Sequence, residues 1–106
     1  MSVLRQILVE LRELLQACGE HVYLGGLSDA LEGDDGAMNV YLQSNDLWGG
    51  SGSIADQACL TGRGETRTNL ERLLIKLGNE QGRVGIVNVR TAEWVIVFEG
   101  WARERI

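Results

Sequence analysis

Residues 84–98 read Val-Gly-Ile-Val-Asn-Val-Arg-Thr-Ala-Glu-Trp-Val-Ile-Val-Phe, and this stretch decides the fold class of the chain. Two runs within it, 84–89 and 94–98, are rich in β-branched and aromatic residues, which are typical of strands. The residues between them, 90–93, have the length of a short hairpin loop. The stretch therefore predicts a C-terminal β-hairpin, and the chain as a whole an α+β fold in which amphipathic helices pack against it.

The same residues also fit a single helix. Thr91 would cap such a helix, and Trp94, Phe98 and Trp101 would share one of its faces. We favour the hairpin because of the β-branched content. Two strands alone are marginal in water, so helices must cover them. An exposed edge of the hairpin would also pair with a second copy, which predicts a homodimer.

Two amphipathic helices are predicted upstream of this stretch. Over residues 2–18 the apolar side chains recur every three or four positions, and a glycine follows directly. Residues 69–77 contain a shorter apolar stripe. The capping-box pattern of Thr68 and Glu71 marks the start of this second helix, and we expect Gly78 to end it.

The middle of the chain is less regular. Residues 20–44 have a partial helical pattern, but Gly25 and Gly26 would each cost about 1 kcal/mol inside a helix, so we expect a break there. Gly-Asp-Asp-Gly at 33–36 is typical of a turn. Residues 37–43 fit a helix or a strand, and we favour a helix.

The length and the charge of the chain limit the number of domains and the kinds of partner that we expect. At 106 residues it is expected to form one domain, residues 1–106. Residues 1–60 contain two Arg against nine Asp and Glu, a net charge of −7, whereas residues 61–106 contain eight Lys and Arg against six acids, a net charge of +2. An acidic chain repels nucleic acid, so we expect no such partner. Because there is no signal peptide and no apolar run of roughly 20 residues, we expect no membrane contact.

The two cysteines, Cys18 and Cys59, are far apart in the sequence and form no C-x-x-C pair. A single disulfide is one outcome. Small secreted domains tend to contain more cysteines than this, so we favour two free thiols in a reducing compartment. The expected location is therefore the cytoplasm.

A glycine-rich segment, residues 47–56, contains the clearest candidate for a ligand site. It reads Leu-Trp-Gly-Gly-Ser-Gly-Ser-Ile-Ala-Asp, so a large aromatic residue precedes the glycines and a capped helix start follows them. Backbone N–H groups at such a place attract anions, but the phosphate-loop and dinucleotide patterns are both absent. Three interpretations compete: a close-packed turn, which we favour, an anion site, and a flexible linker. The anion site would comprise Trp48, Gly49, Gly50, Ser51, Gly52, Ser53, Arg63 and Arg67.

The same segment resembles a motif of small bacterial domain families to which no activity is assigned. In those families an aromatic-Gly-Gly-x-Gly-Ser-apolar-x-Asp motif lies between helices. Here residues 47–77 match it, together with a loosely similar N-terminal helix. The resemblance implies a small, mainly helical, cytoplasmic bacterial domain, and the β-rich end of the chain departs from it. It implies no catalytic residue.

The sequence contains no convincing set of catalytic residues, which favours a non-enzymatic protein without a cofactor. The acidic residues between 29 and 35 fit a solvated turn better than a metal site. The acidic N-terminal half suits a basic protein partner, so we expect a protein–protein interaction module of the immunity or antitoxin kind. Trp101, Asp34 and Asp35 are its expected interface residues. The alternative is a small-ligand domain that binds an anion at the glycine-rich segment.

Overall fold

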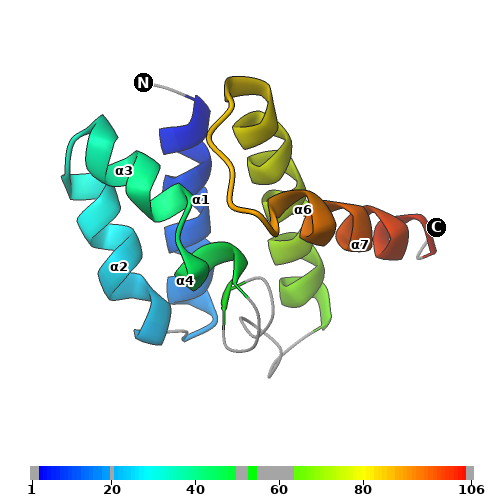
Figure 1. Ribbon diagram of the computed structural model, residues 1–106. Coiled ribbons are helices and arrows are strands. Elements are labelled where there is room, and N and C mark those ends of the chain that lie inside the picture. Colours follow the sequence, from blue (N-terminus) through cyan, green and yellow to red (C-terminus); the bar gives the residue numbers. More distant parts are fainter. Residues whose placement is uncertain (1–2, 20, 50–52, 55–63, 105–106) are drawn as a thin grey trace.

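The computed structural model describes residues 3–19, 21–49, 53–54 and 64–104, and every regular element in these ranges is a helix. In chain order they are α1 (Val3–Ala17), α2 (His21–Glu32), α3 (Asp35–Leu42), α4 (Asn45–Trp48), α6 (Gly64–Val84) and α7 (Thr91–Glu104). Figure 1 shows α1 and α6 side by side, with α2 and α3 on the α1 side and α7 on the other side of α6. The α+β prediction is therefore wrong for the described residues.

The N-terminal helix is confirmed as α1. Its buried side chains follow the predicted apolar spacing, and they are Leu4, Ile7, Leu8, Leu11 and Leu15. Gly19 has a φ of +74°, a left-handed conformation that suits a glycine just after a helix end. The same core also contains the fully buried rings of Trp48 and Phe98, which come from α4 and α7.

The predicted β-hairpin over 84–98 is wrong, and the helix that was its alternative is correct. Helix α6 continues through Val84, and α7 begins at Thr91 after a short loop. Thr91 Oγ1 accepts a hydrogen bond from the Asn88 backbone N–H at 3.0 Å. Asn88 Oδ1 accepts one from the Arg90 backbone N–H at 2.8 Å. These two side chains accept hydrogen bonds from backbone N–H groups that precede α7, and they thereby stabilise the N-terminal end of the helix.

The packing of α7 on α6 explains why the β-branched residues adopt a helix. Helical spacing places Thr91, Val95 and Phe98 on one buried face. A Cβ at Gly78 of α6 would overlap Val95 Cγ2, so the glycine lets α7 approach closely. The expectation that Gly78 ends its helix is wrong, because Gly78 lies inside α6 as a packing position. Burial of this face outweighs the local preference for strands.

The break expected at Gly25 and Gly26 is absent, because α2 passes through both residues. The Cβ position of Gly26 lies 3.6 Å from Tyr41 Cε1 and 3.6 Å from Asp46 Oδ2. Residues of α3 and α4 therefore approach α2 where it has no side chain. The buried residues Leu27 and Ala30 of the same helix supply packing that offsets the cost of two glycines.

Two further helix predictions have different outcomes. The helix favoured for residues 37–43 is confirmed as α3, with Asp34 as its N-cap residue. The second predicted helix exists as α6, but it begins at Gly64 rather than at Thr68. Thr68 and Glu71 therefore lie inside the helix, so the capping-box prediction is wrong at this position.

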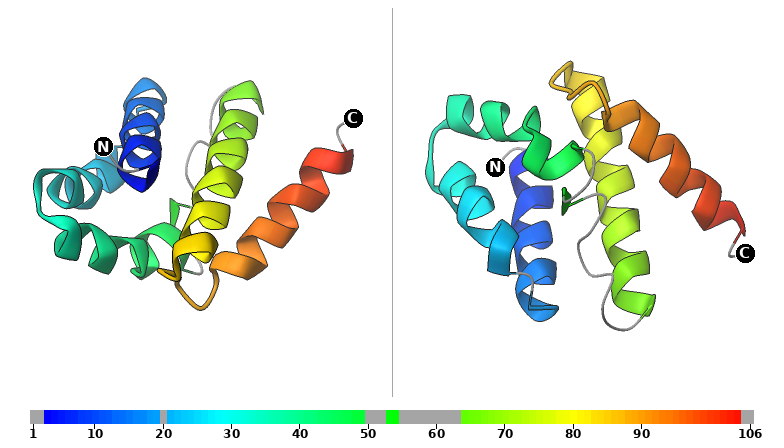
Figure 2. Two further views of the ribbon diagram at one scale, coloured as in Figure 1. Left: turned by 90° about the horizontal axis from the view of Figure 1, so that it is seen from above. Right: turned by 60° about the horizontal axis from the view of Figure 1, so that its bottom comes forward.

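Helix α7 leaves α6 at an angle. The two helices are close at the loop that joins them and apart at the C-terminal end of α7 (Figure 2). In the described structure α7 packs mainly on α6, whereas α1 packs on both α2 and α6.

Candidate functional site

Trp48, a predicted ligand residue, lies fully buried in the core. Its indole Nε1 donates a hydrogen bond to Gln81 Oε1 at 2.8 Å. Gln81 Nε2 donates in turn to the carbonyl oxygens of Leu42 at 3.1 Å and Ile86 at 2.8 Å. One buried glutamine thus joins α3, α4, α6 and the loop after α6. At this place Trp48 acts as a core residue whose single polar atom is satisfied.

Gly49 and Ser53, two further members of the predicted ligand site, are also buried. The Gly49 carbonyl accepts hydrogen bonds from Ser53 Oγ at 2.8 Å and from Trp94 Nε1 at 3.2 Å. A Cβ at Gly49 would overlap the Asn45 carbonyl oxygen, so the chain needs a glycine here. These contacts are typical of a close-packed turn. The remaining predicted members Gly50, Ser51, Gly52 and Arg63 lie outside the described residues.

Arg67, the arginine of the predicted anion site that the structure describes, lies inside the protein between α6 and α7. Its side chain is 11% exposed, and its Nε donates to Glu71 Oε2 at 3.0 Å. The guanidinium carbon lies 5.7 Å from the centroid of the Phe98 ring. A carboxylate and an aromatic ring therefore hold the charge in place. The four described members of the predicted anion site all make contacts within the protein.

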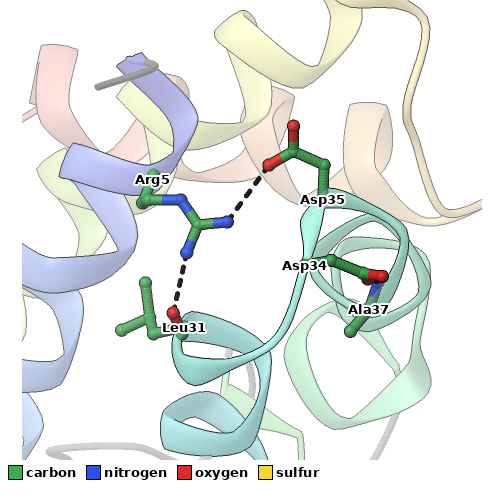
Figure 3. A network of polar contacts seen from close by, with 5 residues as sticks. All are labelled: Arg5, Leu31, Asp34, Asp35 and Ala37. Atoms are coloured by element: carbon green, nitrogen blue, oxygen red, sulfur yellow. Dashed lines mark hydrogen bonds and ion pairs between the residues drawn. The ribbon is translucent and has the colours of Figure 1, made fainter.

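The predicted interface residues Asp34 and Asp35 are exposed between α2 and α3, where they also hold the structure together (Figure 3). Asp34 Oδ1 accepts a hydrogen bond from the Ala37 N–H at 2.9 Å and so caps α3. Asp35 Oδ1 pairs with Arg5 Nη2 at 3.1 Å, and Arg5 Nη1 donates to the Leu31 carbonyl at 2.7 Å. Arg5 thereby joins α1 to the corner between α2 and α3.

Trp101, the third predicted interface residue, is 40% exposed near the end of α7. Its ring centroid lies 5.7 Å from that of Phe98. Several large apolar side chains of α7 and of the chain just before it are also exposed, namely Val84, Val87, Val89, Ile96 and Val97. Together with Trp101 we call these residues the apolar surface.

The excess of acids predicted for the N-terminal half is present at the surface. Seven described Asp and Glu residues of α1 to α4 and their connections are exposed, and we call them the acidic surface: Glu10, Glu13, Asp29, Glu32, Asp34, Asp35 and Asp46. The two arginines of the same region, Arg5 and Arg12, are half-buried. Among the described Asp, Glu, Lys and Arg side chains of this part of the molecule, those that are exposed are therefore all carboxylates.

Cys18, at the end of α1, is disulfide-bonded, and Cys59, the only other cysteine of the sequence, lies outside the described residues. The expectation of a free thiol is wrong for Cys18. The cytoplasmic location was predicted on the premise that both cysteines are free thiols. The disulfide at Cys18 removes that premise. Across the helices that the structure describes, none has the length and hydropathy needed to span a bilayer. No group of three or more His, Cys, Asp or Glu converges within residues 3–19, 21–49, 53–54 and 64–104.

Comparison of the chain with protein-family models, with curated proteins and with solved structures gave no match. The resemblance to bacterial families with the aromatic-Gly-Gly motif therefore stays a prediction. The predicted β-rich end of the chain departed from the mainly helical pattern of those families. In the structure this end is helix α7, so that difference is absent.

Two further residues organise the contacts around Trp48, Gln81 and Asn88, and neither was predicted from the sequence. Asn88 Nδ2 donates to the Gln43 carbonyl at 2.7 Å and thereby joins the loop before α7 to the end of α3. An Asn three positions before Thr91 is a helix-start signal that could have identified Asn88. Nothing in the local pattern distinguishes Gln81 from the exposed polar residues of a long helix.

Proposed function

We propose that the protein is a non-enzymatic interaction module that binds a basic protein through the acidic surface of α1 to α4. The observation that supports this most is that the seven described acids of this region are exposed while Arg5 and Arg12 are half-buried. A surface of one sign speeds association with an oppositely charged partner and disfavours acidic ones. An immunity or antitoxin protein that neutralises a basic partner works in this way.

The apolar surface supplies a second kind of contact. Charge gives selectivity and fast association, whereas buried apolar area around an aromatic anchor supplies most of the affinity in protein interfaces. Trp101 and Ile96, which are 40% and 67% exposed, are the expected anchors. The homodimer was predicted from an exposed hairpin edge, which the helices of the described residues do not contain, so the homodimer stays a prediction without that support. We do not propose the anion-binding alternative, because its described members make contacts within the protein.

Two triple variants test the acidic surface. The first neutralises Glu10, Glu13 and Glu32 as Glu→Gln, since none of these is the Asp34 cap or the Asp35 ion pair. The matched control neutralises three exposed glutamates of the C-terminal region in the same way, Glu65, Glu93 and Glu104. Affinity capture from a bacterial lysate compares both with the unchanged protein, and mass spectrometry identifies the bound proteins.

We expect the unchanged protein and the control to retain the same basic partner, with an isoelectric point above about 9. The first variant should lose it, and salt should weaken the capture. Capture that is equal for all three proteins, or only a homodimer in the eluate, would overturn the proposal.

A further inference from the structure

Pockets of about 390 Å³ and about 310 Å³ open between α2 and α3 and between α6 and α7, respectively. The buried lining residues of the pocket between α6 and α7 are Gly78, Thr91 and Val95, where the two helices touch. Its exposed lining residues are Asn79, Gly82, Val87, Ala92 and Ile96. A partner can therefore reach this pocket from solvent. None of these residues was predicted from the sequence to bind a partner.

The α6 side of this pocket has little side chain to fill it. Gly78 and Gly82 are one turn apart on the same face of α6, and a Cβ at Gly82 would meet nothing described within 4 Å. On the side of α7 and the loop before it, Val87 and Ile96 are 45% and 67% exposed. The two helices also separate toward the C-terminal end of α7 (Figure 2). The pocket thus leaves space for one large apolar side chain from outside, and aliphatic groups line that space.

Glu99 is the charged residue of this lining, and it is half-buried. It forms no ion pair with a described residue, since the pairs in the structure involve Asp35, Glu71 and Glu80. A partner that fills the pocket also covers this carboxylate. Burial of a carboxylate without a counter-charge is costly. The pocket therefore favours an occupant that brings a cation, and it disfavours an acidic or a purely apolar one.

The carboxylate and the apolar lining residues follow one another along α7. Glu99 lies three positions after Ile96 and seven after Ala92, so the three residues share one face of the helix. A partner helix that lies along this face meets the apolar residues and, about one turn or roughly 5 Å further on, the carboxylate. It therefore needs an apolar residue and a cation three or four positions apart.

We propose that this pocket receives an amphipathic helix of the basic partner. One apolar side chain of that helix lies between α6 and α7, and a Lys or Arg one turn away pairs with Glu99. Binding of a helix in an apolar groove through side chains one turn apart is a common mode of recognition. The acidic surface then attracts the partner, and the pocket determines which of its segments docks. The inference rests on the proposed function for the basic partner, whereas the chemistry of the pocket can be tested without it.

NMR titration of the backbone amides tests the kind of occupant. The probes are three alanine-based peptides of about 16 residues, a length at which such helices form in part. The first contains a leucine with one arginine four positions before it and another four positions after it, so that it fits α7 in either direction. The second has glutamates in place of the arginines, and the third has alanine in place of the leucine.

We expect saturable shifts at Gly82, Ala92 and Glu99 with the first peptide, and binding weaker by about tenfold or more with the other two. Absence of saturable binding of the first peptide, or equal binding of the first peptide and either of the others, overturns the proposal. Shifts at the same amides that grow with protein concentration before any peptide is added would mean that a second copy fills the pocket, and they also overturn it.

A pair of glycine variants tests the space between the helices. Gly82→Leu places a side chain in the pocket and should abolish binding of the first peptide. Because Gly82 is exposed with open space at its Cβ position, and leucine is a good helix former, this variant should fold. The matched control is Gly25→Leu in α2, where the glycine is exposed and a Cβ likewise meets nothing described within 4 Å. Equal binding by both variants and the unchanged protein would overturn the proposal.

A pair of glutamate variants tests the charge. Glu99→Gln should weaken binding of the first peptide by about tenfold. Glu93→Gln is the matched control, because Glu93 is an exposed acid of α7 outside the pocket, and it should leave binding unchanged. An equal loss in the two variants would mean unspecific attraction and would overturn the proposal.

Affinity capture with Gly82→Leu separates this inference from the proposed function. If the variant of Glu10, Glu13 and Glu32 loses the basic partner and Gly82→Leu retains it fully, the pocket proposal falls and the proposed function stands. If the first peptide binds and Gly82→Leu blocks it, but the unchanged protein captures no basic protein, the proposed function falls and the pocket proposal stands.

Discussion

The helices around α1 and the helix α7 differ in how their apolar residues are distributed between the core and the surface. Around α1 the large apolar residues are mostly buried and the exposed charged residues are acidic, although Val3, Val22 and Val40 are exposed as well. In α7 the buried face is made by Thr91, Val95 and Phe98, while Ile96 and Val97 are exposed beside it. The first pattern is a conventional amphipathic helix that sequence alone predicts. In α7 the choice of buried face depends on a neighbouring helix. Contact with α6 determines which of its many apolar residues are buried.

The largest expected effect distinguishes a helix from a strand at the C-terminal end. Phe98→Ala should lower the free energy of unfolding by about 3–5 kcal/mol, because it empties a fully buried site. Ile96→Ala should change it by less than about 0.5 kcal/mol, because Ile96 is 67% exposed. In a strand the two residues would share a face and cost similar amounts. Urea denaturation followed by circular dichroism measures both, and similar losses would contradict the helix.

This contrast also marks what the sequence could predict. The spacing of apolar residues in 2–18 was sufficient for α1, and the flanks of Gly49 were sufficient to favour a packed turn. The β-branched run of α7 misled the prediction, because strand preference is local whereas the contact at Gly78 joins two helices. The pocket of about 390 Å³ between α2 and α3 was equally hidden, since its lining residues Asp29 and Tyr41 come from different helices.

The second prediction concerns how each region is attached. The end of α1 is held by the disulfide of Cys18, whereas α7 is held by side-chain packing and hydrogen bonds. Reduction should therefore lower the free energy of unfolding by about 2–4 kcal/mol. Thermal unfolding with and without a reducing agent measures the loss, and Cys18→Ser should remove the dependence on that agent.

Thiol alkylation provides an independent check on the same bond. The native, unreduced protein should leave Cys18 unmodified. Rapid modification of Cys18 in the native protein, with no effect of reduction on unfolding, would contradict the disulfide. The same assay in cells tests the cytoplasmic expectation, because disulfides are rare in reducing compartments.

The third prediction compares two glycines of α6. Gly78→Ala places a methyl group against Val95 and should destabilise the protein by about 1–3 kcal/mol. Gly82→Ala is the matched control, because a Cβ there meets nothing described within 4 Å. It should instead stabilise the helix by about 0.5–1 kcal/mol. Thermal melts of the two variants should move in opposite directions, and equal shifts would argue against close packing of α7 at Gly78.

The smallest expected effect compares two hydroxyl groups. Tyr41→Phe removes a buried hydroxyl without a described partner and should raise the free energy of unfolding by about 1 kcal/mol. Thr91→Val removes a hydroxyl that accepts the Asn88 N–H and should lower it by about 1 kcal/mol. Denaturant titration measures both. A loss in the Tyr41 variant would mean that its hydroxyl is already satisfied.

The three tryptophans differ in their exposure to solvent, so the intrinsic fluorescence of the protein reports on different parts of the molecule. Trp48 is fully buried, Trp94 is half-buried, and Trp101 is 40% exposed at the outer end of α7. Indole emission moves to longer wavelength as water reaches the ring, and a soluble quencher reaches exposed rings first. A partner that covers α7 should therefore shield Trp101 from quenching while the emission of Trp48 stays constant. Unfolding should change the emission of both, so intrinsic fluorescence separates docking on α7 from loss of the core without any added label.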